Sequence, residues 1–215
     1  MNGFIGTLEK ITFQNGFKNL TFGIEHVVKT MQMMTIEKYV SRATLCRELR
    51  LGEGSVKTII SHLKKSGYAS SIKSGTFLLE NGWYLINEIS KFVPSETSIK
   101  KSKFLPSEYN YAILLRNFAD YIIDGMDQRD FAVKFGATGA LTTTYHNYEF
   151  RIATSESFYL IVDKETEKTL IKHLQPKEGD VVIITFASNE ITAELAAKSS
   201  ALYTIDIKQT VSTYT

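Results

Sequence analysis

The sequence of 215 residues lacks the features that mark secreted, membrane and cysteine-rich proteins. A single cysteine, Cys46, excludes an intramolecular disulfide framework and a zinc site built from several cysteines. The longest apolar runs, such as residues 181–184, are far shorter than the roughly 20 residues of a transmembrane helix. The first ten residues lack the basic and apolar regions of a signal peptide. We therefore expect a cytoplasmic protein with no membrane span.

Motifs of catalysis and cofactor binding are also missing. The chain contains no Gly-rich phosphate loop ending in Lys-Ser or Lys-Thr, no His-Glu-x-x-His and no Gly-x-Ser-x-Gly. The four histidines, at 26, 62, 146 and 173, show no spacing typical of metal ligands. The sequence therefore predicts that the protein is not an enzyme and has no catalytic residues, cofactor or metal site.

Charge is unevenly distributed along the chain, although the net charge is only +2. Residues 1–100 contain 13 basic and 8 acidic residues, whereas residues 101–215 contain 12 basic and 15 acidic residues. A basic first part joined to a mildly acidic second part indicates a polyanion-binding module attached to another domain.

The chain is expected to form two domains, since 43% of its residues are hydrophobic and can supply packed cores. Residues 93–107 contain two prolines and lack a helical or strand period, which predicts a linker. The first domain is expected over 1–92, where residues 1–20 form an extension of no assigned role. The second domain is expected over 108–215.

The first domain shows the periodicity of a helix-turn-helix. Apolar residues three and four positions apart predict a helix over 22–34. Ser41 can cap a second helix, which carries Cys46 on its buried face. Gly52 fits the position where the chain leaves that helix with a positive φ.

A third helix over 55–65 carries the predicted DNA-contacting face. Its apolar residues form one stripe, and the opposite face is small, polar and basic. Such a face suits a helix in the major groove, where lysines reach phosphates or guanine. A hairpin over 68–79, with Lys73 near its tip, and a further helix follow. The predicted DNA-binding residues are Arg42, Ser55, Lys57, Thr58, Ser61, His62, Lys64, Lys65 and Lys73.

Three short motifs occur between residues 41 and 67. They read Ser-Arg-x-x-Leu-x-x-x-Leu at 41–49, Leu-Gly-Glu-Gly-Ser-Val-Lys at 51–57 and Leu-Lys-x-x-Gly at 63–67. Together with the hairpin, they resemble the winged-helix segment of a family of archaeal transcription regulators. That family often continues with Leu-Thr-x-x-Gly, where this chain has Leu-Glu-Asn-Gly at 79–82, a difference that affects the helix cap more than DNA contact. The resemblance implies a DNA-binding winged helix.

The second domain alternates strand-like and helix-like segments, which predicts a small α/β layer domain. The whole chain is thus expected to be an α+β protein of two domains, a winged helix-turn-helix and an α/β layer. The predicted strands are 109–115, 138–145, 148–152, 158–162, 181–187 and an edge strand over 202–207, and the predicted helices are 127–135, 163–174 and 189–202.

Further motifs extend the resemblance over most of residues 21–205. Arg-Asp-x-Ala at 129–132, Gly-Ala-x-Gly-Ala at 136–140 and Glu-Gly-Asp-Val-Val at 178–182 are similar to the appended C-terminal domain of the same regulators, which has no established chemistry. Glycines at a helix-to-strand turn let backbone approach a ligand, although they also serve a tight turn alone. The candidate effector-binding residues are Arg129, Asp130, Gly136, Thr138 and Gly139.

These observations predict a sequence-specific regulator of transcription that binds duplex DNA. Two-fold operators require two copies, so the C-terminal domain is expected to dimerise, to sense a small-molecule effector, or both. Two alternatives stay open. One is an enzyme, such as a small-molecule kinase, that carries a winged-helix appendage, and the other is a winged-helix module that binds proteins.

Overall fold

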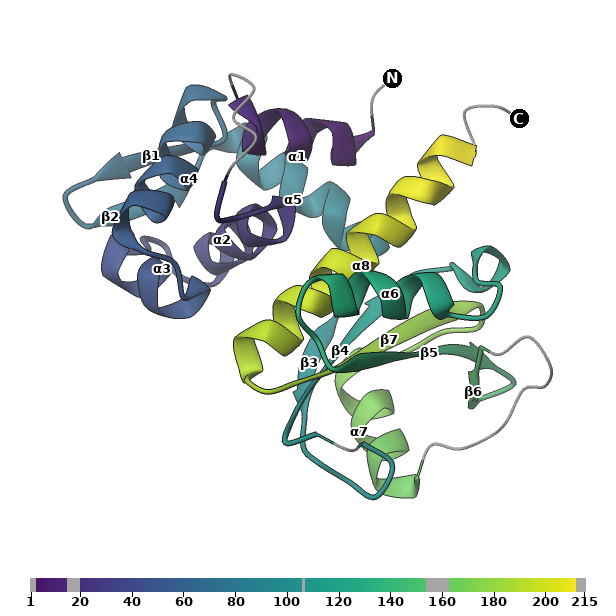
Figure 1. Cartoon of the computed structure of the whole chain (residues 1–215). Helices are drawn as coiled ribbons and strands as arrows, with labels where there is room; N and C mark the ends of the chain where they lie inside the picture. Colours follow the sequence, from purple (N-terminus) through teal and green to yellow (C-terminus); the bar gives the residue numbers. More distant parts are fainter. Residues whose placement is uncertain (1–2, 15–19, 106, 154–162, 212–215) are drawn as a thin grey trace. The chain divides into compact units, whose positions relative to one another are not determined.

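The computed structural model describes residues 3–14, 20–105, 107–153 and 163–211. It shows a mixed α/β chain with antiparallel sheets (Figure 1). The chain divides into two compact units, unit 1 over Met1–Ile89 and unit 2 over Ser90–Thr215. None of the described helices combines the length and apolarity needed to cross a membrane.

Unit 1 contains five helices and one small hairpin among its described residues, and their order along the chain is nearly the one that the sequence predicts. The second, third and fourth helices begin within two residues of their predicted starts. Inward-facing side chains such as Val27, Met31, Leu45 and Ile59 are fully buried and form the core of this unit. The elements are α1 (Phe4–Thr12), α2 (Ile24–Ile36), α3 (Arg42–Leu49), α4 (Glu53–Lys65), β1 (Ala69–Ile72), β2 (Gly75–Leu78) and α5 (Glu80–Phe92), which crosses the unit boundary.

Two residues determine where α3 begins and ends. The Ser41 hydroxyl accepts a hydrogen bond from the Thr44 backbone N–H, which confirms the predicted cap. The predicted positive φ at Gly52 is wrong, because this residue is extended, with φ −64°, and caps α4. The left-handed residue is Arg50, with φ 49°. Helix α3 therefore ends before the glycine, which leaves Gly52 to start the next helix.

The extension to which the sequence assigned no role forms α1. Its side chains Ile5, Leu8 and Ile11 are buried, and the helix packs against α2 and α4. This amphipathic helix adds a third partner to the apolar stripe of α4. Unit 1 therefore includes the chain from residue 3 onward.

The hairpin β1–β2 is held against the helices by the segment before α3. Val40 and Thr76 exchange two backbone hydrogen bonds of 2.9 Å. Gly75 has φ +145°, and a Cβ there would lie 2.7 Å from the Val40 carbonyl oxygen. A side chain at this position is therefore excluded by both backbone strain and close approach.

Unit 2 is built on a five-stranded antiparallel sheet of order β3-β4-β7-β5-β6. The central strand β7 is buried along its length and pairs with β4 on one side and β5 on the other. The elements are β3 (Glu96–Ile99), β4 (Tyr109–Leu115), the 3-10 turn η2 (Ala119–Tyr121), α6 (Met126–Lys134), β5 (Gly139–His146), β6 (Glu149–Ile152), α7 (Lys164–Leu174), β7 (Asp180–Ala187) and α8 (Glu190–Val211).

Helices cover both faces of this sheet (Figure 1). Helices α6 and α8 lie on one face and α7 lies on the other. On the α7 face, Leu170 and Leu174 pack in one cluster with Leu114, Val182 and Ile184. Alternate residues of β4 and β7 point to the opposite face, so these strands are apolar on both sides, as the sequence of β7 predicts.

Several predictions for this unit are confirmed. Strand β4 has the predicted bounds, and Asp163 caps α7 by accepting hydrogen bonds from the backbone N–H groups of Glu165 and Thr166. The β5–β6 turn is at Asn147 and Tyr148, one residue later than predicted. Both residues have positive φ, as a tight two-residue hairpin requires.

Two predictions for unit 2 are wrong. Part of the predicted linker forms the edge strand β3, which pairs with β4. The predicted edge strand over 202–207 is the continuation of α8, since small residues such as Ala197 and Ala201 let this helix lie close to the sheet. The predicted strand over 158–162 lies outside the described residues.

Candidate functional site

A cluster of exposed cations lies on unit 1, where α3 and α4 meet. Arg42 is the first residue of α3, and Lys57, Lys64 and Lys65 belong to α4. All four side chains are exposed. With Ile60 and Ser61 they line a surface hollow of about 290 Å³. We call this surface the basic hollow; it brings together five of the nine predicted DNA-binding residues.

An acidic residue that the sequence did not single out lies among these cations. Glu53 Oε1 is 3.0 Å from Arg42 Nη1 and 3.2 Å from Lys57 Nζ. The hydrogen bond from Arg42, with a second one from Lys57, lowers the pKa of Glu53 below its usual value. Its position, four residues before Lys57 in a helix, was the sequence signal for this pair. The carboxylate occupies a place between two cations where another anion could bind.

The hydroxyl residues of the predicted face are partly buried and mostly engaged locally. Ser55 Oγ lies 2.6 Å from Thr21 Oγ1, and Thr58 donates to the Gly54 carbonyl at 3.0 Å. Ser61 lies within the basic hollow. These short side chains therefore shape the surface and leave the long cations as its outermost groups.

The sequence prediction wrongly places His62 on the exposed face that contacts DNA. Its side chain is buried, with Nδ1 3.1 Å from the Thr12 carbonyl oxygen and the ring edge-on to Phe22. Helix α1 covers the side of α4 that the helical pattern alone assigns to solvent. His62 therefore joins two helices of unit 1 and is not available for contact with DNA.

Lys73 is exposed in the turn between β1 and β2, and its neighbour Ile72 is 51% exposed. Ile72 is the last residue of β1 and Lys73 follows it, in the same compact unit as the basic hollow. The hairpin thus exposes both a cation and an apolar side chain near its turn.

The candidate effector residues lie on α6 and in the connection from α6 to β5. Arg129 and Asp130 are exposed on α6, with their charged groups 3.9 Å apart. Gly136 has φ +102°, and Thr138 donates through its backbone N–H and its hydroxyl to the Phe186 carbonyl. Gly139 is buried against the Phe186 ring. The glycines therefore serve a tight connection between α6 and β5, and a ligand site at these residues stays a prediction.

Unit 2 has cavities elsewhere. One of about 550 Å³ lies where β3 ends and β4 begins, beside α7 and the first residue of α8. Another of about 320 Å³ lies between the segment 121–128 and α8. Neither is lined by the predicted effector residues. No sequence motif marks the first cavity, because its walls come from separate segments between residues 98 and 190.

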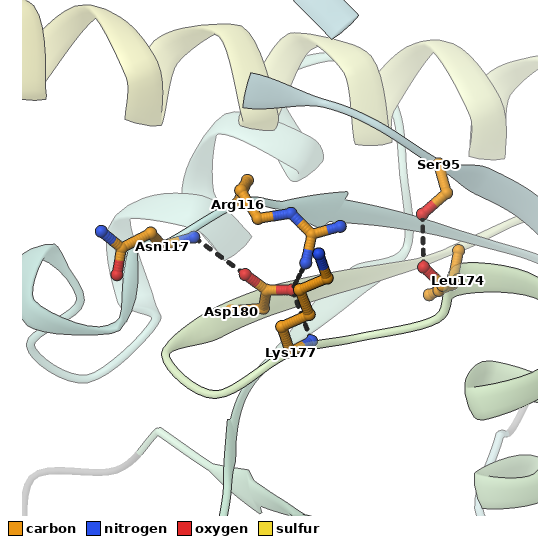
Figure 2. Close-up of polar contacts among 6 residues, drawn as sticks. All are labelled: Ser95, Arg116, Asn117, Leu174, Lys177 and Asp180. Carbon is orange, nitrogen blue, oxygen red and sulfur yellow. Dashed lines mark hydrogen bonds and ion pairs between the residues drawn. The ribbon is translucent and has the colours of Figure 1, made fainter. Parts of the chain in front are cut away.

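Asp180, the last residue of the Glu-Gly-Asp motif and the first of β7, has a structural role (Figure 2). Asp180 is fully buried and pairs with Arg116, which extends from the end of β4. The same carboxylate accepts from the backbone N–H groups of Asn117 at 2.9 Å and Lys177 at 2.7 Å. Close by, Ser95 donates to the Leu174 carbonyl at the end of α7. These bonds fasten the turn before β7 to the neighbouring strand.

A buried lysine on α8 was also missed by the sequence prediction. Lys198 is 2% exposed, pairs with Glu96 of β3 and lies 3.5 Å from Glu194. Its ammonium is 5.8 Å from the centre of the Tyr111 ring. Burial, together with the charge of Glu96, raises the pKa of the Tyr111 hydroxyl well above its usual range. These contacts connect the edge strand β3 to the long helix α8.

Within the described parts of the chain, no three His, Cys, Asp or Glu residues are grouped to hold a metal ion.

Comparisons with known proteins show that most of unit 2 is similar to a domain whose function is unknown. Residues 106–205 match the model of a domain of unknown function, DUF4443. Among solved structures, the hypothetical protein PH0730 from Pyrococcus horikoshii OT3 matches with a TM-score of 0.69 and 24% identity, over 87% of this chain and 94% of that one. This similarity shows a shared fold across both units. A search of curated proteins finds no match.

Proposed function

We propose that this protein is a transcriptional regulator that recognises duplex DNA sequence through unit 1. The order of its elements, two helices, a short turn, a third helix and a hairpin, is that of a winged helix-turn-helix. In this proposal α4 enters the major groove and the hairpin is the wing. Lys73 at the tip of the wing contacts the DNA backbone.

The basic hollow is the observation that carries the proposal. Four exposed cations lie around Ile60 and the small side chain of Ser61, at the start of α3 and along one side of α4. Small residues allow close approach to the duplex, and long cations reach the phosphates that dominate affinity. Ser61 lies among these cations and can reach a base edge.

Unit 2 supplies dimerisation, effector sensing, or both in this proposal. Two recognition helices bind two half-sites, so a homodimer is the assembly that a two-fold operator requires. An effector bound to unit 2 alters the spacing of these helices. Light scattering of the full chain tests the dimer, and a monomer at the concentrations that bind DNA would contradict it.

The proposal is tested by measuring duplex-DNA affinity at several salt concentrations. Lys57→Ala combined with Lys65→Ala removes two phosphate contacts. Binding is expected to weaken for many DNA sequences, and the slope of log affinity against log salt should fall by about 2. The matched control removes two exposed lysines of α7 in unit 2, Lys168→Ala with Lys172→Ala, and should keep the wild-type slope.

Two outcomes would contradict the proposal. One is a wild-type slope in the Lys57 and Lys65 double variant, which would place any DNA contact on another face. The other is no binding by the full chain at about 50 mM salt, where electrostatic association is strongest. The second outcome would favour a protein-binding winged helix or an enzyme with a winged-helix appendage.

A further inference from the structure

The cavity of about 320 Å³ between the segment 121–128 and α8 is lined by a polar side chain that is almost completely buried. This residue is Gln128, which is 5% exposed. Its Nε2 donates to the Thr204 hydroxyl at 3.1 Å, and that hydroxyl donates in turn to the Ser200 carbonyl at 2.9 Å. Because the hydroxyl proton is already used, the amide must present its nitrogen to Thr204, and its orientation is therefore fixed.

The other atom of this amide, Gln128 Oε1, is an acceptor that a ligand can reach. It accepts no hydrogen bond from a described residue. It also keeps contact with solvent, because Gln128 is absent from the residues whose side-chain atoms are both unpartnered and fully enclosed, which are Glu96, Asn110, Thr142 and Thr144. An unpartnered acceptor on a side chain this deeply buried favours a ligand that offers an N–H or O–H donor.

The charge of the lining indicates which donor fits. Two carboxylates, those of Asp124 and Asp127, line the cavity, and its described lining includes no lysine, arginine or histidine. One oxygen of Asp124 accepts from the Met126 backbone N–H at 2.9 Å, and neither carboxylate forms an ion pair with another described residue. The cavity therefore favours a cationic ligand, and this preference does not depend on a histidine that titrates near neutral pH.

Apolar side chains form the rest of the lining. Ile123 is 87% exposed and Met126 is 49% exposed, and both line the cavity together with Tyr121 and Ile207. Large apolar side chains that are exposed together often mark a binding site. The ligand is therefore expected to carry a hydrocarbon chain beside its cationic group, and the volume lies at the lower end of the range of small-molecule sites.

We propose that this cavity binds an aliphatic amine. The ammonium group donates to Gln128 Oε1 and is attracted by Asp124 and Asp127, while the hydrocarbon chain packs on Ile123 and Met126. The inference rests on the proposed function only in making the amine the effector of the regulator. Amine binding by a chain that binds no DNA would overturn the proposed regulator and support the cavity, whereas DNA binding without amine binding would overturn the cavity alone.

Calorimetric titration of the full chain tests the ligand class. The probes are 1-aminopentane and 1,5-diaminopentane, and the controls are 1-pentanol and pentanoate, which have a similar chain and no cation. At least one amine is expected to bind at least tenfold more tightly than both controls. The proposal is overturned if neither amine binds at about 10 mM, a level well above a millimolar dissociation constant, or if either control binds within tenfold of the amines.

Variants then locate the site on the protein. Gln128→Met keeps the length of the side chain and removes Oε1, so amine affinity should fall at least tenfold, as loss of a hydrogen bond to a charged group predicts. Asp127→Asn changes an exposed residue, so the fold should be kept, and affinity should fall about threefold.

The matched control for Asp127→Asn is Glu165→Gln. This substitution also removes one exposed carboxylate of unit 2, but on α7, which covers the opposite face of the sheet from α6 and α8 (Figure 1). It should bind amines as the wild type does. Wild-type affinity in Asp127→Asn, or an equal loss in Glu165→Gln, would overturn the assignment even where Gln128→Met fails to fold.

Discussion

We predict that the buried His62 side chain stabilises unit 1. Its substitution should therefore lower stability and leave DNA binding unchanged. Its ring is buried, bonds the Thr12 carbonyl at 3.1 Å and lies edge-on to Phe22. His62→Ala removes this hydrogen bond and leaves the carbonyl buried without its donor, at a cost of about 1–3 kcal/mol. Loss of the aromatic contact adds about 0.5–1.5 kcal/mol. The expected total is about 3 kcal/mol.

A loss of this size is large for a unit of fewer than one hundred residues. It corresponds to a fall in melting temperature of roughly 12–24 °C. The single tryptophan, Trp83, lies on α5 within unit 1 and is 44% exposed. Its fluorescence therefore follows the unfolding of unit 1 in the full chain, even where unit 2 melts separately.

The control for His62→Ala is Lys64→Ala, two residues later on the same helix and exposed. The two variants should behave in opposite ways. His62→Ala should lower the melting temperature and keep the salt dependence of DNA binding at temperatures where the chain is folded. Lys64→Ala should change stability by less than about 0.5 kcal/mol and weaken DNA binding. An unchanged melting temperature together with weaker DNA binding in His62→Ala would refute this reasoning.

Two further predictions concern carboxylates. Glu53→Gln frees Arg42 and Lys57 and removes a negative charge, so DNA affinity at low salt should rise about twofold, as screened repulsion at roughly 7 Å predicts; unchanged affinity in a filter-binding assay would contradict this. Asp180→Ala leaves the Arg116 guanidinium without its buried partner and should destabilise unit 2 by about 3–5 kcal/mol. Hydrogen exchange of β4 and β7 measures this loss, and wild-type protection there would count against it.

The sequence predicts elements whose residues carry their own periodicity. Strand β4 and helix α7 were located because an apolar run and an Asp cap identify them locally. The continuation of α8 was not, because residues 202–207 include several β-prone side chains and only packing against the sheet decides between helix and strand. Strand β3 was missed for a related reason, since its four residues become a strand only by pairing with β4.

The candidate sites also differ in how far the sequence alone predicts them. The basic hollow was largely predictable, because residues 57, 61, 64 and 65 lie on one side of a single helix. The burial of His62 was not, because its partner Thr12 is fifty residues away in the sequence. The cavity where β3 ends and β4 begins could not be predicted either, since four separate segments must fold before its walls exist.

The place of β7 in the sheet determines when unit 2 can fold during synthesis. This strand is translated after β3, β4, β5 and β6, yet it lies between β4 and β5 and pairs with both. The ribosome therefore releases most of unit 2 before the strand that joins its two halves is available. Such non-local pairing slows folding and leaves strand edges exposed in the nascent chain. Unit 1 has no such requirement, since its hairpin joins strands adjacent in sequence, and can complete its core while unit 2 is still being made.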